Sequence, residues 1–550
     1  MSFGTHKRLK VGLTVNETSD GRSENDIAGC IQGVQFSSEL AIDLKLGPTN
    51  MYGNSTDLPT SPVMTKLGKG DVISWVASLP DSKDRKILDL RFNEIGKERA
   101  DALSKVLHTY LEMEILDLLK NQLGDSKDAL LLLAAAFPNC KALTTLKLCW
   151  NRLGKDGISL LAAVLPNCKM LTTIDFGANR LGSEAMSLLA VVLPSCKALT
   201  TLGLSRNQIN AEGVIKLAAV LASCESLIRL NLSNNEIDVY GLVALAHSLP
   251  HCKLLKTLNL DYNRFYYGVS ALANALPHSL PHCKLLKTLN PDYNRIYYGV
   301  SALASALPHC EALTTLTLDG NHIGDNGTTL LAVAFSKCIA LRAVSLEKTE
   351  CGIEGVISLA AALPNCVSLM TLRFGGNKIG NKGVILLAAA FPNCKALRAV
   401  HLSDNKIGDK GAIALADALP NCFAMTILVL SCNKISNKGA ESLAAALPNC
   451  PLLTELNILG NYGIDVALKS KISSLVFMQP QRKAKAALVT WNRRRHVIFG
   501  VLVNRVFAAF LLGFIRVVCI NNSAVPDADP EMVEETLESF HRFDLETQSL

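Results

Sequence analysis

The stretch LPNCKMLTTIDFGANRLGSEAMSLLAVVLPSC, Leu165 to Cys196, decides the fold, because it is one full copy of a recurring unit. Copies of the unit run from about residue 80 to about residue 470 and align on one asparagine. The aligned residues are Asn93, Asn121, Asn151, Asn179, Asn207, Asn235, Asn263, Asn294, Asn321, Asn377, Asn405, Asn433 and Asn461, with Thr349 in one further copy. The steps are 28 residues, except 30 after Asn121, 31 after Asn263 and 27 after Asn294. A fixed period of this length is the signature of a solenoid.

The first half of each unit has the hydrophobic spacing of a β-strand. Leu143, Leu146 and Leu148 precede the asparagine of one unit, and the last two are separated by the two-residue period of a strand. We expect the alternate side chains to point to the opposite face of this strand: Thr145, Lys147 and Cys149. Each unit therefore begins with a strand whose leucines face a core.

The second half of each unit has the spacing of a helix. The sequence predicts a turn at Gly157 and then a helix of roughly three turns, since Ile158, Leu161 and Leu165 recur at helical intervals. Pro166 ends this helix, because proline restrains the residue before it and cannot continue the helix. A single unit cannot bury its leucines, but stacked units share one long core.

The pattern LxxLxLxxNxIGxxGxxxLAxALPNC resembles the ribonuclease-inhibitor subtype of leucine-rich repeats. The same subtype is found in the repeat arrays of NOD-like receptors and of Ran GTPase-activating proteins. The resemblance implies an α/β fold, a right-handed horseshoe-shaped solenoid of about 14 repeats of 28 residues. It also implies a parallel β-sheet on the concave face and α-helices on the convex face. The motif is specific for this fold but not for an activity, since one fold carries many functions.

Length and composition fit one elongated array better than several globular domains. The chain has 550 residues and a formal net charge of +7, which for this size does not by itself indicate nucleic-acid binding. The basic, polar start MSFGTHKRLKVGLT contains no apolar run. We therefore expect no secretory signal and a cytoplasmic location, with the nucleus as the alternative.

The character of the sequence changes along the chain and predicts four segments. The first is rich in Gly, Ser, Asn and Thr, and we expect it to be poorly ordered apart from a capping strand around Leu40 to Leu44. The segments are residues 1–70 (poorly ordered, with the capping strand), 71–478 (repeat array), 479–520 (basic, then apolar and helical) and 521–550 (acidic, flexible tail).

The apolar stretch Val497 to Ile520 leaves three interpretations open. It is long enough to span a bilayer, but Arg505 and Arg516 interrupt it, and an arginine within the hydrocarbon is costly. The alternatives are a helix packed on the last repeat, which we favour, a helix on a membrane surface, and a membrane span.

Most of the 17 cysteines stand eleven residues before the asparagine position of a unit. They are Cys140, Cys168, Cys196, Cys224, Cys252, Cys283, Cys310, Cys338, Cys366, Cys394, Cys422 and Cys450. We expect a column of buried free thiols, because the spacing of metal-binding motifs is missing. The expected compartment, rather than distance, argues against disulfides.

The recurring asparagines are interpreted as structural. Their amides can bond to backbone groups of the neighbouring turn, which would otherwise be buried without partners. We assign this role to Asn151, Asn179, Asn207, Asn235, Asn263, Asn321, Asn377, Asn405 and Asn433.

A near-copy of one unit stands in the middle of the array, where His251 to His278 is followed by His282 to His309. Pro291 replaces the Leu260 of its twin, and we expect a kink or weakened strand pairing there, because proline has no N–H to donate. The two copies are rich in tyrosine, which we interpret as structural, with an interaction patch as the alternative. The tyrosines are Tyr262, Tyr266, Tyr267, Tyr293, Tyr297 and Tyr298.

Two residues before the asparagine position, a face that we expect to be exposed on the concave sheet is acidic in four consecutive units. The acids are Asp261, Asp292, Asp319 and Glu347. Equivalent residues on adjacent strands lie about 5 Å apart, so these carboxylates repel one another unless cations meet them. Two explanations stay open: local neutralisation, or docking of a basic protein partner on the four acids together with Tyr262 and Tyr293. The candidate neutralising residues are Arg264, Arg295, His322 and Lys348.

A basic rim follows the asparagines. One residue after the asparagine position stand Arg152, Arg180, Arg264, Arg295, His322, Lys378, Lys406 and Lys434. We interpret this rim as a solvated edge and expect no nucleic-acid partner, because we find neither interleaved aromatic residues nor a phosphate-binding loop.

The sequence favours a non-enzymatic, monomeric scaffold that recognises a protein partner through the concave face and needs no cofactor or metal. No HExxH or GxSxG motif is present, and GNKIGNKG (Gly376 to Gly383) lacks the Ser or Thr that follows the lysine of a phosphate-binding loop. The resemblance implies two alternatives. One is a regulator of a small GTPase, and the other is a fragment of a NOD-like sensor without its nucleotide-binding domain.

Overall fold

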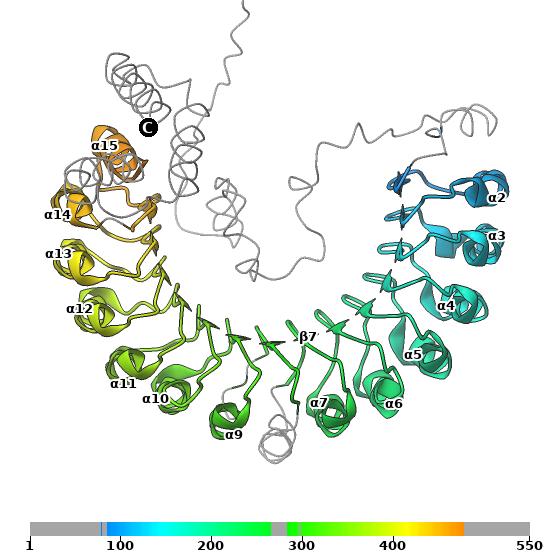
Figure 1. Ribbon diagram of the computed structural model, residues 1–550, viewed down its shortest axis with the longest axis horizontal. Helices are drawn as coiled ribbons and strands as arrows, with labels where there is room; N and C mark the ends of the chain where they lie inside the picture. Colours follow the sequence, from blue (N-terminus) through cyan, green and yellow to red (C-terminus); the bar gives the residue numbers. More distant parts are fainter. Residues whose placement is uncertain are drawn as a thin grey trace, which may run out of the picture. The chain divides into compact units, whose positions relative to one another are not determined.

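The computed structural model describes residue 79 and residues 85–265, 283–294, 296, 299–450 and 452–477. The segments predicted for residues 1–70, 479–520 and 521–550 lie outside these ranges, as do Arg295, Tyr266, Tyr267, Tyr297 and Tyr298. The described residues form one repeat array in which strands and helices alternate (Figure 1).

The strands form one sheet in sequence order, from β1 to β14, and every neighbouring pair is parallel. They are β1 (Ile87–Asp89), β2 (Ile115–Asp117), β3 (Thr145–Lys147), β4 (Thr173–Asp175), β5 (Thr201–Gly203), β6 (Arg229–Asn231), β7 (Thr257–Asn259), β8 (Thr288–Asn290), β9 (Thr315–Thr317), β10 (Ala343–Ser345), β11 (Thr371–Arg373), β12 (Ala399–His401), β13 (Ile427–Val429) and β14 (Glu455–Asn457).

Helices connect the strands. The α-helices are α2 (Lys97–Val106), α3 (Lys127–Ala136), α4 (Gly154–Ala162), α5 (Gly182–Val192), α6 (Ala211–Leu221), α7 (Val239–Ser248), α9 (Val300–Ala306), α10 (Gly324–Phe335), α11 (Ile353–Ala362), α12 (Gly380–Ala390), α13 (Asp409–Ala418), α14 (Asn437–Ala446) and α15 (Val466–Phe477). Short 3-10 helices are η3 (Leu107–Thr109), η4 (Leu123–Asp125), η5 (Phe137–Asn139), η6 (Leu165–Asn167), η7 (Leu193–Ser195), η8 (Leu249–His251), η10 (Leu307–His309), η11 (Leu363–Asn365), η12 (Phe391–Asn393), η13 (Leu419–Asn421) and η14 (Leu447–Asn449).

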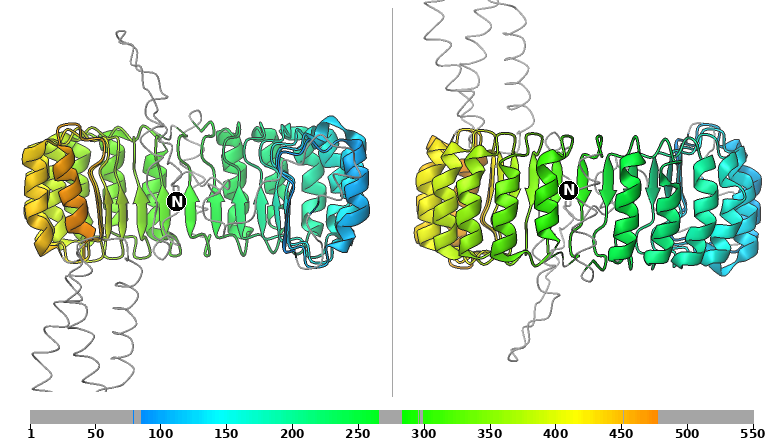
Figure 2. Two further views of the ribbon diagram at one scale, coloured as in Figure 1. Left: turned by 90° about the horizontal axis from the view of Figure 1, so that it is seen from above. Right: turned by 90° about the horizontal axis from the view of Figure 1, so that it is seen from below.

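Within the array the strands lie on the inner side of an arc and the helices on its outer side (Figures 1 and 2). The leucines that have strand or helix spacing fill the layer between them: Leu146, Leu148, Ile158 and Leu161 are each fully buried or nearly so. Burying a leucine side chain contributes about 2 kcal/mol, and each coil adds several such residues to one continuous core. The predicted α/β solenoid with parallel strands is confirmed.

Three local predictions need correction. Gly157 lies inside α4 rather than in the turn before it, and its missing side chain leaves room for Leu153 and Leu130, which a Cβ would approach to 2.9 and 3.1 Å. Pro166 does not terminate an α-helix directly, because α4 ends at Ala162 and the proline lies within η6. The strand predicted before Asn151 is shorter than its leucines suggested: β3 runs from Thr145 to Lys147, and Leu143 and Leu148 lie on either side of it.

The predicted weakness at Pro291 is present. The register between β8 and β9 contains two residue pairs, Thr288 with Thr315 and Leu289 with Leu316, whereas β7 and β8 share three. In the preceding coil the Leu260 N–H donates to the Asn290 carbonyl at 2.8 Å. Pro291 has no N–H with which to make the equivalent bond, so the ladder is shorter at this point.

Candidate functional site

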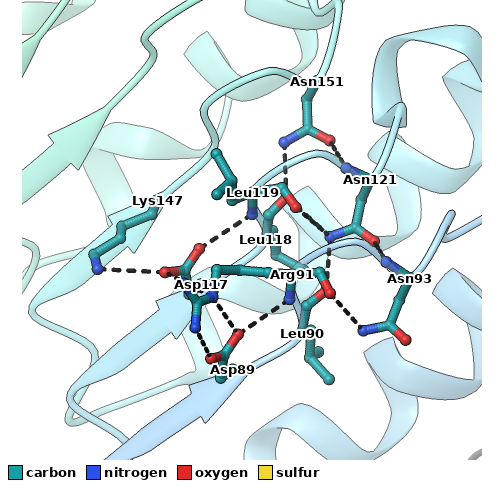
Figure 3. A network of polar contacts seen from close by, with 10 residues as sticks. All are labelled: Asp89, Leu90, Arg91, Asn93, Asp117, Leu118, Leu119, Asn121, Lys147 and Asn151. Atoms are coloured by element: carbon teal, nitrogen blue, oxygen red, sulfur yellow. Dashed lines mark hydrogen bonds and ion pairs between the residues drawn. The ribbon is translucent and has the colours of Figure 1, made fainter. Parts of the chain in front are cut away.

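The asparagines form a continuous hydrogen-bonded ladder along the sheet (Figure 3). The Asn151 side chain accepts the Asn121 N–H at 2.9 Å and donates to the Leu118 carbonyl at 2.8 Å in the preceding coil, as well as to its own Leu148 carbonyl at 3.0 Å. The side chains of six further asparagines likewise accept the N–H of the asparagine one coil earlier and donate to a carbonyl of that coil: Asn179, Asn207, Asn235, Asn321, Asn405 and Asn433. Asn377 accepts the Thr349 N–H instead, and Asn263 accepts the Ile237 N–H; both also donate to a carbonyl of the preceding coil. These amides therefore join the coils and are buried away from any ligand.

The ladder forces the residue before each asparagine into a left-handed backbone conformation. We call these residues the pre-asparagine column; their φ angles lie between 50° and 73°. The column consists of Phe92, Lys120, Trp150, Ala178, Arg206, Asn234, Tyr262, Tyr293, Gly320, Lys348, Gly376, Asp404, Cys432 and Gly460. A non-glycine residue in this conformation costs roughly 1 kcal/mol, yet Phe92, Trp150 and Tyr262 are large and are 38, 42 and 41 % exposed. The turn points these side chains outwards, although strand alternation would point them into the core.

The first coils add an ion-pair cluster beside the ladder (Figure 3). Arg91 donates to both carboxylate oxygens of Asp89 at 2.8 and 2.6 Å, and Lys147 lies 3.3 Å from Asp117. Burial raises the pKa of the Asp117 carboxyl, even though Lys147 opposes this shift. Burial also acts on Asp89, but the hydrogen bonds and charge of Arg91 outweigh it and lower the pKa of that carboxyl.

The four acids predicted as a concave docking site form hydrogen bonds and an ion pair within the array. Asp261 and Asp292 are only 2 and 5 % exposed, so the expectation of exposed side chains is wrong for both, whereas Asp319 and Glu347 are half-buried. Asp261 accepts the Asp292 N–H at 3.3 Å, Asp292 accepts the Asp319 N–H at 2.6 Å, and Asp319 accepts the Glu347 N–H at 2.7 Å. Each of these carboxylates thus bonds to the backbone of the next coil.

Which group accepts this backbone N–H depends on the residue two positions earlier in the same coil. In other coils an Asp or Asn at the end of the strand accepts this backbone N–H from within its own coil, as Asp175 does for Gly177 at 2.9 Å and Asn231 for Ser233 at 3.0 Å. Thr317 and Ser345 occupy that position in the coils of Asp319 and Glu347. In these two coils the acid of the preceding coil replaces the missing acceptor. In the coil of Asp292 the acceptor Asn290 is present, and it shares the Asp292 N–H with Asp261.

Burial of three neighbouring carboxyls changes their protonation. Desolvation raises the pKa of Asp261 to about 7 and that of Asp319 to about 6, and the nearby acids add to both shifts. Desolvation and the charges of its two neighbours raise the pKa of Asp292 well above its usual value. Carboxyls that are buried, bonded to backbone N–H groups and partly protonated are poor attachment points for a basic partner, because the negative charge is partly removed.

The cations predicted to neutralise the acids pair elsewhere. Arg264 lies 3.2 Å from Glu236, and His322 lies 2.7 Å from Glu350. Lys348 forms no ion pair with a described acid, and the Arg373 guanidinium meets Glu347 at 3.0 Å instead. The expectation of local neutralisation by the basic rim is therefore wrong for the described residues.

Tyr262 and Tyr293 stack face to face, with ring centroids 4.3 Å apart and planes 9° from parallel. The ring of Tyr293 also lies over Gly320, where a Cβ would come within 2.3 Å of it. The absence of a side chain at Gly320 thus leaves space for this stack. The structure brings the two tyrosines together at the end of a groove.

This groove, of about 1100 Å³, borders the sheet at the ends of the strands and runs along the N-terminal half of the array. Aromatic and basic side chains from the pre-asparagine column and from the basic rim line it. The lining includes Phe92, Lys120, Trp150, Arg152, Ala178, Arg180, Arg206, Tyr262, Arg264 and Tyr293. Lys120 Nζ lies 5.2 Å from the centroid of the Phe92 ring and 5.3 Å from that of Trp150, and so contacts both rings. The prediction that no aromatic residues interleave with the basic rim is wrong.

The recurring cysteines, which stand eleven residues before the asparagine position, lie near the ends of the helices and do not form a reactive site. None of the cysteines within the described ranges is in a disulfide. The thiols of Cys140, Cys168 and Cys196 lie 3.7, 3.7 and 3.6 Å from the carbonyl four residues earlier, at the end of the helix. Burial raises the pKa of Cys140 and Cys168 to about 11, which keeps these thiols protonated and unreactive at neutral pH.

Two further features are missing from the described part of the chain. It contains no group of three or more His, Cys, Asp or Glu side chains arranged to hold a metal ion. No helix there has the length and apolar character needed to cross a membrane. The stretch Val497 to Ile520 lies outside the described residues.

Six segments of the chain match the family model described as Leucine Rich repeat: residues 195–218, 223–246, 309–332, 365–388, 393–416 and 421–444. Together with the parallel sheet and its alternating helices, these matches make the array a leucine-rich-repeat solenoid. No curated protein matches the chain. Among solved structures, Leiomodin-1 Actin-Binding Site 2 (ABS2) is similar, at 14% identity over 30% of this chain and 94% of that chain. Its TM-score is 0.26, so this likeness carries no functional argument.

Proposed function

We propose that the array is a non-enzymatic scaffold that recognises a protein partner on its concave side, as leucine-rich repeats typically do. The observation that carries the proposal is the pre-asparagine column. The asparagine ladder fixes the backbone on both sides of each of its residues, so exposed aromatic and basic side chains are held in a row along one sheet. A row of preorganised side chains favours binding, because little conformational entropy is lost when a partner docks.

The chemistry of the described polar groups supports a binding role. The buried carboxyls of Asp261, Asp292 and Asp319 accept hydrogen bonds from backbone N–H groups. The thiols of Cys140 and Cys168 are protonated at neutral pH. A catalytic site would need a nucleophile beside a base, or an acid and a base with separated roles. These groups are instead bonded within the scaffold.

The finer assignments also belong to this proposal. We assign the repeats to the ribonuclease-inhibitor subtype, on the 28-residue step and the α-helix in each coil. We also assign the chain to the cytoplasm, as a monomer. Regulation of a small GTPase is the alternative implied by the resemblance to Ran GTPase-activating proteins. Single-turnover GTP hydrolysis with a panel of small GTPases distinguishes the two, since acceleration of any of them contradicts the non-enzymatic assignment.

Cross-linking mass spectrometry of the full chain in its native cells tests the binding role. The expected cross-links join one recurring protein to lysines on the strand side of the array, such as Lys120, Lys147 and Lys348. Lysines at the outer helices, such as Lys216 in α6, serve as the internal reference. Cross-links confined to the outer helices would contradict binding on the concave side.

A further inference from the structure

The groove between Phe92 and Tyr293 has an unfilled position in its middle. The pre-asparagine column runs Phe92, Lys120, Trp150, Ala178 and Arg206 on consecutive coils. Lys120, from the preceding coil, lies over one face of the Trp150 ring at 5.3 Å from its centroid. The opposite face is therefore available on the side of the next coil, to which Ala178 belongs. Ala178 has only a methyl group at this position, between the coil of Trp150 and the coil of Arg206. Neighbouring strands are about 4.8 Å apart, so Trp150 and Arg206 are separated by roughly 10 Å, enough for one planar ring between them.

The cations beside this position are available to a partner. Arg152 and Arg264 are already paired, with Asp125 at 2.7 Å and with Glu236 at 3.2 Å. Arg180 and Arg206 are exposed, and neither side chain forms an ion pair or hydrogen bond with any residue that the structure describes. Two unpaired arginines near Ala178, one in its own coil and one in the next, favour a partner with anionic groups next to a flat ring.

The number of free cations decides which class of polymer fits. A single-stranded nucleic acid brings one phosphate per nucleotide and needs a continuous basic track. The groove offers two unpaired arginines and Lys120, and it also contains Glu94 and Glu236. This balance suits a peptide with two or three carboxylates better than a polyphosphate chain.

We propose that this groove binds an extended acidic segment of a partner protein, with one aromatic side chain inserted above Ala178 against the Trp150 ring. Carboxylates that flank this aromatic residue pair with Arg180 and Arg206. The Phe92, Lys120 and Trp150 stack forms one wall of the groove, and the stacked Tyr262 and Tyr293 mark its far end. The inference rests on the proposed function and deepens it, because it names the surface and the chemistry of the partner.

The test uses the full chain and a random dodecapeptide library displayed on phage. The expected selected peptides carry Trp, Tyr or Phe within two positions of Asp or Glu. One selected peptide is then synthesised with a fluorescein label and titrated by fluorescence anisotropy. Selection of peptides without this combination, or no selection at all, overturns the proposal.

Three variants test the assignment of residues with that labelled peptide. Ala178→Trp fills the unoccupied position without removing a charge, in a backbone conformation that already accommodates Trp150. Trp150→Gly removes the stacking face, and Arg180→Glu combined with Arg206→Glu reverses the charge. Each is expected to weaken binding about tenfold or more, as for a central interface residue. Binding unchanged in all three overturns the proposal.

Matched controls come from equivalent positions in the C-terminal half. Lys348→Gly controls for Trp150→Gly, and Lys348→Glu with Lys378→Glu controls for the double charge reversal, since both lysines are exposed. These variants are expected to bind the labelled peptide as the unmodified chain does. Equal loss in the control variants would show a non-specific charge effect and overturn the assignment to the groove.

Two further arms separate this inference from the proposed function. A fluorescein-labelled dodecauridine replaces the peptide in one arm, and binding that is tight and lost in Trp150→Gly overturns the choice of a peptide. In the other arm, a protein partner identified by cross-linking is titrated against the three groove variants. If it binds all of them normally, the scaffold function stands and the groove assignment fails; if no protein partner exists, the proposed function itself fails.

Discussion

The two halves of the array share one backbone but present different surfaces. In the N-terminal half the pre-asparagine column carries side chains, with Phe92, Lys120, Trp150, Arg206 and the two stacked tyrosines among them. In the C-terminal half the same left-handed position is glycine at Gly320, Gly376 and Gly460, alternating with Lys348 and then with Asp404 and Cys432. Glycine adopts this conformation without strain, whereas no glycine occupies it from Phe92 to Tyr293. The N-terminal half therefore departs further from the backbone preference, and all the aromatic residues of the column lie there.

The difference supports the proposed location of the binding surface. A tryptophan held at a positive φ costs free energy, and its exposed ring recovers little of it from the core. The groove lies along this half of the array, and the shared asparagine ladder supports it from beneath. The asparagine ladder is thus a structural requirement common to the coils, whereas the groove belongs only to the coils of the N-terminal half.

The largest expected effect comes from the feature that the halves share. Asn207→Leu and Asn405→Leu each remove an acceptor for a backbone N–H and a donor to a carbonyl of the preceding coil. Leaving two buried backbone groups without partners costs on the order of 3 kcal/mol. Urea denaturation should show similar losses for both variants, and peptide binding to the folded Asn405→Leu variant should be unchanged. A large loss in one half only would show that the ladder is not equivalent throughout.

A smaller effect is expected where the halves meet, at the buried carboxyls. Their raised pKa values mean that the folded state holds protons between about pH 4 and pH 7 that the unfolded chain releases. Their contribution to stability is therefore largest at the acidic end of this window and declines as the pH rises through it. Asp292→Asn keeps the acceptor for the Asp319 N–H but removes one charge.

We expect Asp292→Asn to raise the melting temperature relative to the unmodified chain by on the order of 2 °C at pH 8, and by less at pH 5. Differential scanning calorimetry at both pH values measures this. Asp404→Asn, which changes an exposed acid of the C-terminal half, is the control and should show no such trend. An Asp292→Asn difference that is the same at both pH values contradicts the raised pKa values of these carboxyls.

The smallest effect on stability is expected when a side chain is removed from the N-terminal half of the pre-asparagine column, or added to its C-terminal half. Trp150→Gly loses the contact with Lys120 but relieves a positive φ, so its free energy of unfolding should stay within about 1 kcal/mol of the unmodified value. Gly376→Ala introduces a Cβ at a φ of +69° and 2.7 Å from Lys348 Cγ, and should destabilise by about 1 kcal/mol. Chemical denaturation of both variants measures the contrast. A strongly destabilised Trp150→Gly would make the tryptophan a structural residue.

The repeat, its phase and the element types follow from the sequence because they depend on local rules. Leu146, Leu148 and Leu161 have spacings that only a strand followed by a helix can bury together. The asparagine bonds also agree with the role that unpaired backbone groups suggest. These features repeat in every coil, so a single copy carries the information.

The surface could not be predicted in the same way, because it depends on a change of backbone direction. Strand alternation places Trp150 on the side of Leu148, and only the left-handed turn before the asparagine points it outwards. The bond from Asp292 to the next coil depends on Thr317 replacing the usual acceptor there, which alternation does not reveal. The glycines at Gly320, Gly376 and Gly460 are the signal in the sequence that could have revealed the turn.

The missing N–H of Pro291 has a consequence for how the array unfolds. In a solenoid the coils are coupled only to their neighbours, so a lost ladder bond lowers the coupling at one seam while leaving every coil intact. We therefore expect the array to unfold in two cooperative parts under partial denaturation: the coils up to β8 and the coils from β9 onwards. The exchange of one leucine for Pro291 thus divides the array into two parts that should differ in hydrogen exchange and in sensitivity to proteolysis.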